Sequence, residues 1–143
     1  MTIDAELVTR KLLLIAADLE PLRTIHGKGR DAFLASLLDQ AVVERLLERT
    51  ITRMIDVNYH LVTANGQPPP SDYHASFVQL RDLQILDHVF AVRIARAAGL
   101  RNRLVHDYQD IDPGKVYDAL DAALGDVPIY LSSVNALLKR TAP

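Results

Sequence analysis

Apolar side chains recur every three or four residues along most of the chain, and this spacing restricts the fold more than any other feature. One such run extends from about Ile3 to Ile25, and a longer one extends from Phe33 to Leu61. A third spans the C-terminal segment from Val116 to Leu138. The spacing places apolar side chains on one face of a helix, whereas no segment alternates strictly enough for a strand. We therefore predict an all-α, up-and-down bundle of four main helices plus short helices.

Helix-breaking and capping residues predict where these helices begin and end. Asn65-Gly66 is a suitable end for the second run, and the prolines at 68–70 cannot continue a helix. Ser71 or Asp72 can cap the helix that follows. Asp112-Pro113 marks another start, with the aspartate as the cap and the proline at the first helical position. The proline segment therefore reads as a loop within one domain.

Composition is consistent with a single domain over residues 1–143. The chain has 143 residues, 49% of them hydrophobic, which is enough for one core. Because it contains no cysteine, disulfides and thiolate metal sites are excluded, and a reducing cytoplasm is the expected location. The longest apolar run, Leu12 to Ala17, is far shorter than the about 20 residues of a membrane span, so no membrane association is expected.

The segment from Arg101 to Tyr108 concentrates the side chains that carry chemistry. A guanidinium can hold a phosphate through two parallel hydrogen bonds, and histidine can both accept and release protons near neutral pH. Asn102 and His106 are four residues apart and share a helix face, whereas Arg101 lies about 140° from His106. Gly99 after an apolar run predicts a helix end, which would place Arg101 at the start of a new turn.

The charge distribution favours a local rather than an extended nucleic-acid contact. The formal net charge is −2, which argues against a protein that coats nucleic acid nonspecifically. Between positions 93 and 106, however, every charged side chain except histidine is an arginine: Arg93, Arg96, Arg101 and Arg103. We predict that Arg93, Arg96 and Arg103 contact RNA phosphates near the motif. A solvated helix face would produce the same pattern.

The sequence indicates neither a metal site nor a phosphate-binding loop outside this motif. The remaining histidines lack histidine or carboxylate neighbours three or four residues after them, as a metal site would favour: His26, His60, His74 and His88. No glycine-rich phosphate loop is present, because the short Gly27-Lys28-Gly29 segment has no strand before it. We therefore predict no metal and no cofactor. The aromatic residues Tyr73, Phe77 and Phe90 are expected in the core.

The motif resembles that of the HEPN domains, whose signature is an arginine, four to six residues and a histidine, often with a polar residue after the arginine. Arg101, Asn102 and His106 fit this signature. The longer pattern of HepT-like proteins adds a tyrosine two residues after the histidine, and Tyr108 supplies it. HepT-like proteins are the toxin half of pairs with a minimal nucleotidyltransferase, so the resemblance implies a homodimeric toxin and a nucleotidyltransferase antitoxin as its partner.

The resemblance and the residue chemistry together predict a metal-independent endoribonuclease. His106 would take the proton from a ribose 2′-hydroxyl, Arg101 would stabilise the charge on phosphorus, and Asn102 would position the phosphate or the imidazole. DNA would not be a substrate, because it lacks this hydroxyl. In HepT-like pairs the matching tyrosine receives AMP from the antitoxin, which implies that adenylylation of Tyr108 silences the toxin.

Two other interpretations use the same residues. The chain would be a non-catalytic helical module that presents a nucleotide or RNA to a nucleotidyltransferase, or it would be a plain helical scaffold. In the plainest reading, His106 is a partly buried histidine and Arg101 is a surface partner for Asp107 or Asp110. Catalysis requires a titratable group at His106, whereas binding tolerates glutamine there and a scaffold is indifferent to both positions.

Overall fold

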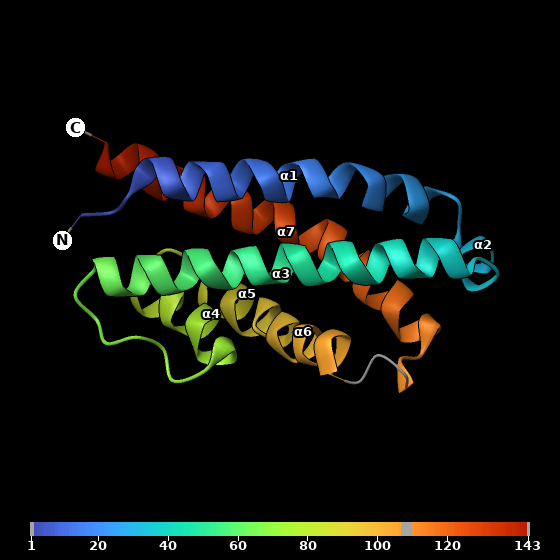
Figure 1. The fold of residues 1–143 in the computed structure, drawn as a ribbon. Helices are drawn as coiled ribbons and strands as arrows, with labels where there is room; N and C mark the ends of the chain where they lie inside the picture. The colour runs from blue at the N-terminus through green and yellow to red at the C-terminus, as the bar shows by residue number, and fades with distance from the viewer. Residues whose placement is uncertain (1, 107–109, 143) are drawn as a thin grey trace.

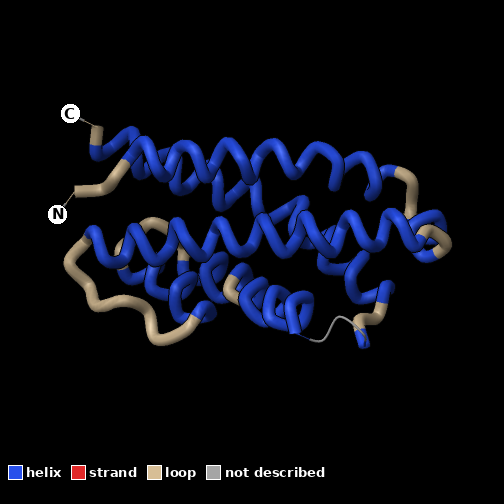
Figure 2. The backbone as a smooth tube through the Cα atoms, in the orientation of Figure 1, coloured by secondary structure: helices blue, strands red, loops and turns tan. Residues whose placement is uncertain are grey.

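The computed structural model describes residues 2–106 and 110–142, which form seven helices and no strand (Figure 1). Three long helices, α1, α3 and α7, pack against one another. The shorter helices α4 and α6 lie against α3 on its other side, and α5 packs against α4 and α6. The backbone tube shows loops at the turns between these helices and at the two chain ends (Figure 2). The predicted all-α bundle is confirmed. The short helices α4, α5 and α6 take the place of the fourth main helix.

Helix α1 (Ala5–Gly27) begins two residues after the predicted start at about Ile3. The Asp4 carboxylate accepts a hydrogen bond from the Leu7 backbone N–H at 3.0 Å and so caps the first turn. The helix then buries one apolar stripe against α3 and α7: Val8, Leu12, Ile15, Leu19, Leu22 and Ile25.

The second predicted helix is divided in two. Helix α2 (Arg30–Leu34) ends after one turn, and helix α3 (Leu37–Ala64) starts after Ser36, whose hydroxyl accepts from the Asp39 N–H at 3.1 Å. The Gln40 side chain donates to the carbonyls of Phe33 and Leu34, which satisfies acceptors at the end of α2. The prediction of one continuous apolar helix missed this break, because Ser36 acts as a cap inside an otherwise regular pattern.

Helices α4 (Tyr73–Asp82) and α5 (His88–Ile94) follow the proline loop. Asp72, one of the two predicted caps, accepts from the Ala75 N–H at 2.7 Å. Phe77 and Phe90 are buried as predicted, but Tyr73 is 38% exposed, so the prediction of a fully buried aromatic stripe is wrong at Tyr73.

Helix α6 (Arg96–His106) carries the motif, and α7 (Pro113–Thr141) ends the bundle. As predicted, Asp112 caps α7, accepting from the Gly114 N–H at 2.8 Å, and Pro113 stands in its first turn. No helix in the described part of the chain is long and apolar enough to cross a membrane.

A buried polar network connects α7, α3 and α4. The Tyr130 hydroxyl, completely buried, donates to the Asn58 side-chain oxygen and lies 3.1 Å from the Met54 carbonyl. The Asn58 amide in turn donates to the Ser76 hydroxyl at 3.1 Å. Burial also raises the pKa of Tyr130 well above its ordinary value, so the phenol stays protonated. The network fixes α4 against α3, and Tyr73 lies at the start of α4.

Candidate functional site

The motif lies inside one helix rather than at the junction of two. The helix break is at Ala95, between α5 and α6, and Gly99 stands in the interior of α6. A Cβ built at Gly99 would lie 3.6 Å from the Arg103 Nη1 atom, so the glycine borders the Arg103 guanidinium. The prediction that Gly99 ends a helix and that Arg101 starts a new turn is therefore wrong. A glycine ends a helix when it adopts positive φ, as Gly66 does after α3.

Arg101 points towards α3 and α4. Its Nε lies 3.4 Å from the Thr52 hydroxyl of α3, and its guanidinium carbon lies 5.2 Å from the centre of the Tyr73 ring. Tyr73 contacts the Tyr59 ring edge to face. The half-buried guanidinium thus stands over an aromatic face, where a cation is attracted by the ring quadrupole, at the edge of a hollow of about 320 Å³.

This hollow also contains a carboxylate and a weakly acidic phenol. Asp56 lines it and forms an ion pair with Lys11 at 3.1 Å. Burial, together with the neighbouring Tyr73 and Asp72, raises the pKa of Tyr59, so this phenol is neutral near pH 7. Sequence reasoning missed the roles of Thr52 and Tyr73, because positions so far apart in sequence become neighbours of Arg101 only through packing.

Asn102 and His106 lie on the exposed side of α6. They are four residues apart on one face, and both side chains are exposed, so the reading of His106 as a partly buried histidine is wrong. Arg101 projects about 140° away from His106 around the helix axis. Tyr108 and Asp107 lie outside the described residues.

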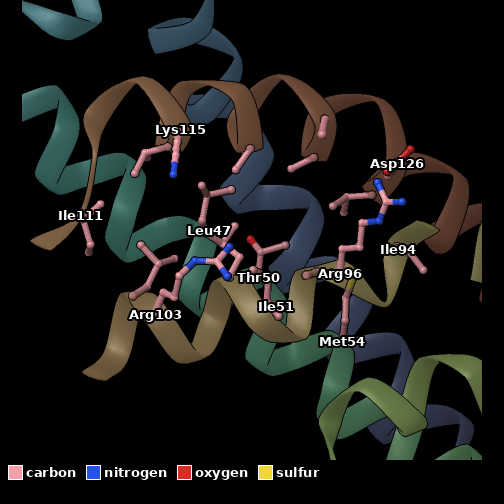
Figure 3. Close-up of a pocket in the computed structure, with 18 of the residues that line it drawn as sticks. Leu47, Thr50, Ile51, Met54, Ile94, Arg96, Arg103, Ile111, Lys115 and Asp126 are labelled. Atoms are coloured by element: carbon pink, nitrogen blue, oxygen red, sulfur yellow. The ribbon is translucent and has the colours of Figure 1, made fainter. Parts of the chain in front are cut away.

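The other arginines are arranged around a second, larger cavity. Arg96 and Arg103 of α6 and Lys115 of α7 line a pocket of about 720 Å³ between α3, α6 and α7 (Figure 3). Arg93 also lines it, and its Nη2 forms an ion pair with Asp126 of α7 at 3.0 Å. The basic strip is thus divided, with Arg101 on one side of α6 and Arg96 and Arg103 on another.

The histidines outside the motif have local roles or are exposed. His26 contacts Asp121 at 2.9 Å and stacks on Tyr117, and the His60 ring accepts from the Asp4 N–H. Within residues 2–106 and 110–142, no group of three or more histidine, aspartate or glutamate side chains is placed to hold a metal ion.

The chain resembles known nucleases over nearly its whole length. It is 35% identical over 136 residues to the tRNA nuclease HepT of Aphanizomenon flos-aquae, covering 95% of this chain and 92% of that protein. It is 21% identical over 131 residues to the mRNA nuclease HepT of Shewanella oneidensis, covering 92% of this chain and 98% of that protein.

A solved structure shares the fold. The tri-AMPylated HEPN toxin of Shewanella oneidensis, in complex with the MNT antitoxin, superposes with a TM-score of 0.82 at 22% identity, covering 91% of this chain and 97% of that one. The family model described as "Ribonuclease HepT-like" matches residues 15–134, which include Arg101, Asn102, His106 and Tyr108. The chain therefore belongs to the HepT-like ribonuclease family.

Proposed function

We propose that this protein is a metal-independent endoribonuclease that acts as the toxin of a toxin–antitoxin pair. The observation that carries the proposal is the exposed pair of Asn102 and His106 on the last turns of α6, within the signature of the family. The relatives named as a tRNA nuclease and an mRNA nuclease support RNA as the substrate.

In this mechanism His106 acts as the general base. It removes the proton from a ribose 2′-hydroxyl, whose oxygen attacks the adjacent phosphorus while the bond to the 5′-oxygen breaks. The products are a 2′,3′-cyclic phosphate and a free 5′-hydroxyl. Asn102, one turn before His106 on the same face, has an amide that can hold the phosphate or orient the imidazole.

Arg101 stabilises the negative charge that builds on the phosphorane. Its guanidinium is held by Thr52 and Tyr73, so part of its orientation is fixed before the substrate binds. Preorganised donors of this kind lower a barrier because they need little rearrangement during the reaction.

A homodimer would supply the second proton-transferring histidine that one chain lacks. The departing 5′-oxygen needs a proton, and one histidine does not easily serve both ends of an in-line displacement in one step. A two-fold axis near α6 would bring a second His106 and a second Arg101 into the same cleft. Mixing Arg101→Ala chains with His106→Ala chains tests this arrangement, because a shared cleft restores part of the cleavage that each variant lacks.

The proposed partner is a nucleotidyltransferase antitoxin that adds AMP to Tyr108. The AMPylated HEPN toxin bound to an MNT antitoxin is the structural neighbour that supports this step. Tyr108 lies two residues beyond His106 in the sequence, so an attached nucleotide would bring a negative charge and a base close to the arginines of α6. It would then compete with RNA as a tethered ligand at high effective concentration.

The decisive experiment compares RNA cleavage by the wild type and by His106→Gln. Glutamine keeps a polar side chain but cannot act as a base near neutral pH, so cleavage should be lost while RNA binding remains. If His106→Gln cleaves as fast as the wild type, the protein is not an enzyme of this kind. RNA binding without cleavage by the wild type would favour the non-catalytic binding module.

A further inference from the structure

The larger cavity has the size and lining of a ligand site. Its volume of about 720 Å³ falls within the range of small-molecule pockets, which is about 300–1,000 Å³. Apolar side chains from α3, α5, α6 and α7 supply much of the lining: Leu47, Ile51, Met54, Ile94, Leu104 and Val116. Such walls suit a ligand that displaces water from the cavity and presents a flat, weakly polar surface to the apolar side chains. An aromatic ring has such a surface.

One buried hydroxyl in the lining has no hydrogen-bond partner in the described part of the chain. Thr50 of α3 is 1% exposed and lines the cavity, and its Oγ1 makes no hydrogen bond to any group within residues 2–106 and 110–142 (Figure 3). Buried polar groups are nearly always hydrogen-bonded, so an orphaned hydroxyl inside a cavity points to a ligand that completes it. The hydroxyl can both donate and accept, which suits the edge of a heterocyclic base.

The positively charged side chains at the cavity favour a ligand with an anionic group beside its apolar part. Among the described residues, the lining carries the cations Arg93, Arg96, Arg103 and Lys115 and the carboxylates Asp110, Asp112 and Asp126. Asp126 pairs with Arg93, and Asp112 accepts from the Gly114 N–H as the cap of α7, so positive charges exceed negative ones by one. In Figure 3 the Arg103 side chain extends from α6 towards Thr50 and Leu47, and Lys115 extends from α7 on the opposite side. A planar ring with a phosphate next to it satisfies both parts of this lining.

The cavity lies close to the proposed catalytic face. Arg103 and His106 are three residues apart, so they are neighbours on α6, separated by about 60° around the axis and about 4.5 Å along it. Arg101, in contrast, lies about 160° from Arg103. A nucleotide next to the phosphate at His106 would therefore have the cavity within reach.

We propose that this cavity is a base-binding subsite, which takes a nucleobase of the RNA substrate with the flanking phosphate on Arg103, Arg96 or Lys115. The inference rests on the proposed ribonuclease function. Single-stranded RNA is recognised through bases that leave the stack and enter pockets of this kind. A free mononucleotide has the same chemistry, so the test must separate the two sources.

The test measures how much tetranucleotide binding depends on the bases. Fluorescein-labelled 2′-O-methyl tetranucleotides of A, G, C and U cannot be cleaved by 2′-hydroxyl attack, and an abasic tetramer carries the same phosphates. We expect the wild type to bind at least one base-bearing tetramer roughly tenfold more tightly than the abasic one. In Ala97→Phe, which fills the cavity from α6, and in Ala123→Phe, which fills it from α7, this difference should disappear. Val89→Phe, at an exposed position of α5 that does not line the cavity, is the matched control and should keep it.

Thr50 provides a second test that leaves the cavity volume nearly unchanged. Thr50→Val should reduce the base-dependent part of the affinity several-fold without weakening the fold, because it removes an unsatisfied hydroxyl. Thr50→Ser keeps the hydroxyl and should bind like the wild type. An equal preference for base-bearing tetramers in the wild type, Ala97→Phe and Ala123→Phe would overturn the proposal, as would the absence of any preference in the wild type.

Two further measurements distinguish RNA from a free mononucleotide as the ligand, and the base-binding subsite from the ribonuclease function. If 5′-mononucleotides bind to the wild type as tightly as the tetramers, and Ala97→Phe abolishes both, the site belongs to a free nucleotide rather than to RNA. Cleavage of unmodified RNA by the wild type and by His106→Gln is scored separately. If the cleavage assay contradicts the ribonuclease function, the binding assay still tests the subsite, because the tetramers report on the cavity and not on catalysis.

Discussion

Replacing Arg101 by alanine should slow RNA cleavage strongly while changing the free energy of unfolding only a little. In the folded protein the guanidinium makes one long hydrogen bond to Thr52, at 3.4 Å, and one cation–π contact with Tyr73, at 5.2 Å. A cation–π contact at a partly exposed site contributes about 0.5–1 kcal/mol, and a hydrogen bond as long as the one to Thr52 adds less. Arg101→Ala should therefore lower the free energy of unfolding by no more than about 1 kcal/mol.

The effect on RNA cleavage should be much larger. Removing one preorganised donor to a developing oxyanion costs about 3–4 kcal/mol, which corresponds to roughly 100- to 1,000-fold in rate. Arg101→Lys should recover little of this, because lysine lacks the planar fork that holds a phosphate through two bonds.

The assay combines single-turnover cleavage of a short RNA with urea unfolding of the same preparations. Arg45→Ala is the matched control, because Arg45 is an exposed arginine whose contact is Glu48 on its own helix, α3. It should leave the unfolding free energy within about 0.5 kcal/mol and the cleavage rate unchanged. Arg101 does not have this catalytic role if Arg101→Ala cleaves within tenfold of the wild type, or if its rate falls only in proportion to the unfolded fraction.

Three other predictions follow from the structure and the family. Tyr130→Phe leaves the buried Asn58 oxygen without its donor and should lower the free energy of unfolding by about 1–3 kcal/mol, measured in urea. Because burial raises the folded-state pKa of Tyr130 above its unfolded value of about 10, wild-type stability should fall as the pH rises above about 10, and Tyr130→Phe should remove that contribution. Tyr108→Phe should still cleave RNA but should escape silencing by the cognate antitoxin with ATP, and mass spectrometry that finds the adenylate on another residue would contradict this assignment. RNA cleavage should persist in excess chelator and single-stranded DNA should stay intact, whereas a requirement for added Mg²⁺ would exclude the proposed mechanism.

Helix boundaries with a local chemical signal were predictable from the sequence. Asp112-Pro113 starts α7 because the carboxylate accepts from an orphan N–H and the proline loses no bond there. Asn65-Gly66 ends α3 because glycine readily adopts the positive φ of 81° found at Gly66. Such signals act within a few residues, so the order and type of the helices followed from them.

Boundaries and orientations set by packing were not predictable. Gly99 carries the same local signal as Gly66, yet it stays inside α6, while the break falls at Ala95, a residue without any breaking tendency. Ala95 is fully buried, so the position of the break is set by its neighbours in the bundle.

The sequence supplies candidate site residues, but it did not predict how they are arranged in space. The spacing placed Asn102 and His106 on one face, and the structure confirms this and shows both exposed. The contact between Arg101 and Tyr73 depends on where α4 packs, and the orphaned Thr50 hydroxyl becomes significant only once α3, α6 and α7 enclose a cavity. Contacts between distant segments leave no signature in a single sequence.

The chemistry of the cleaved ends shows whether the RNA is cut by attack of its own 2′-hydroxyl. A short RNA is incubated with the wild type and with His106→Ala in excess chelator, and the products are identified by mass spectrometry. We expect a 2′,3′-cyclic phosphate and a 5′-hydroxyl from the wild type and intact RNA from His106→Ala. A 3′-hydroxyl with a 5′-phosphate, or the same products at the same rate from His106→Ala, would contradict it.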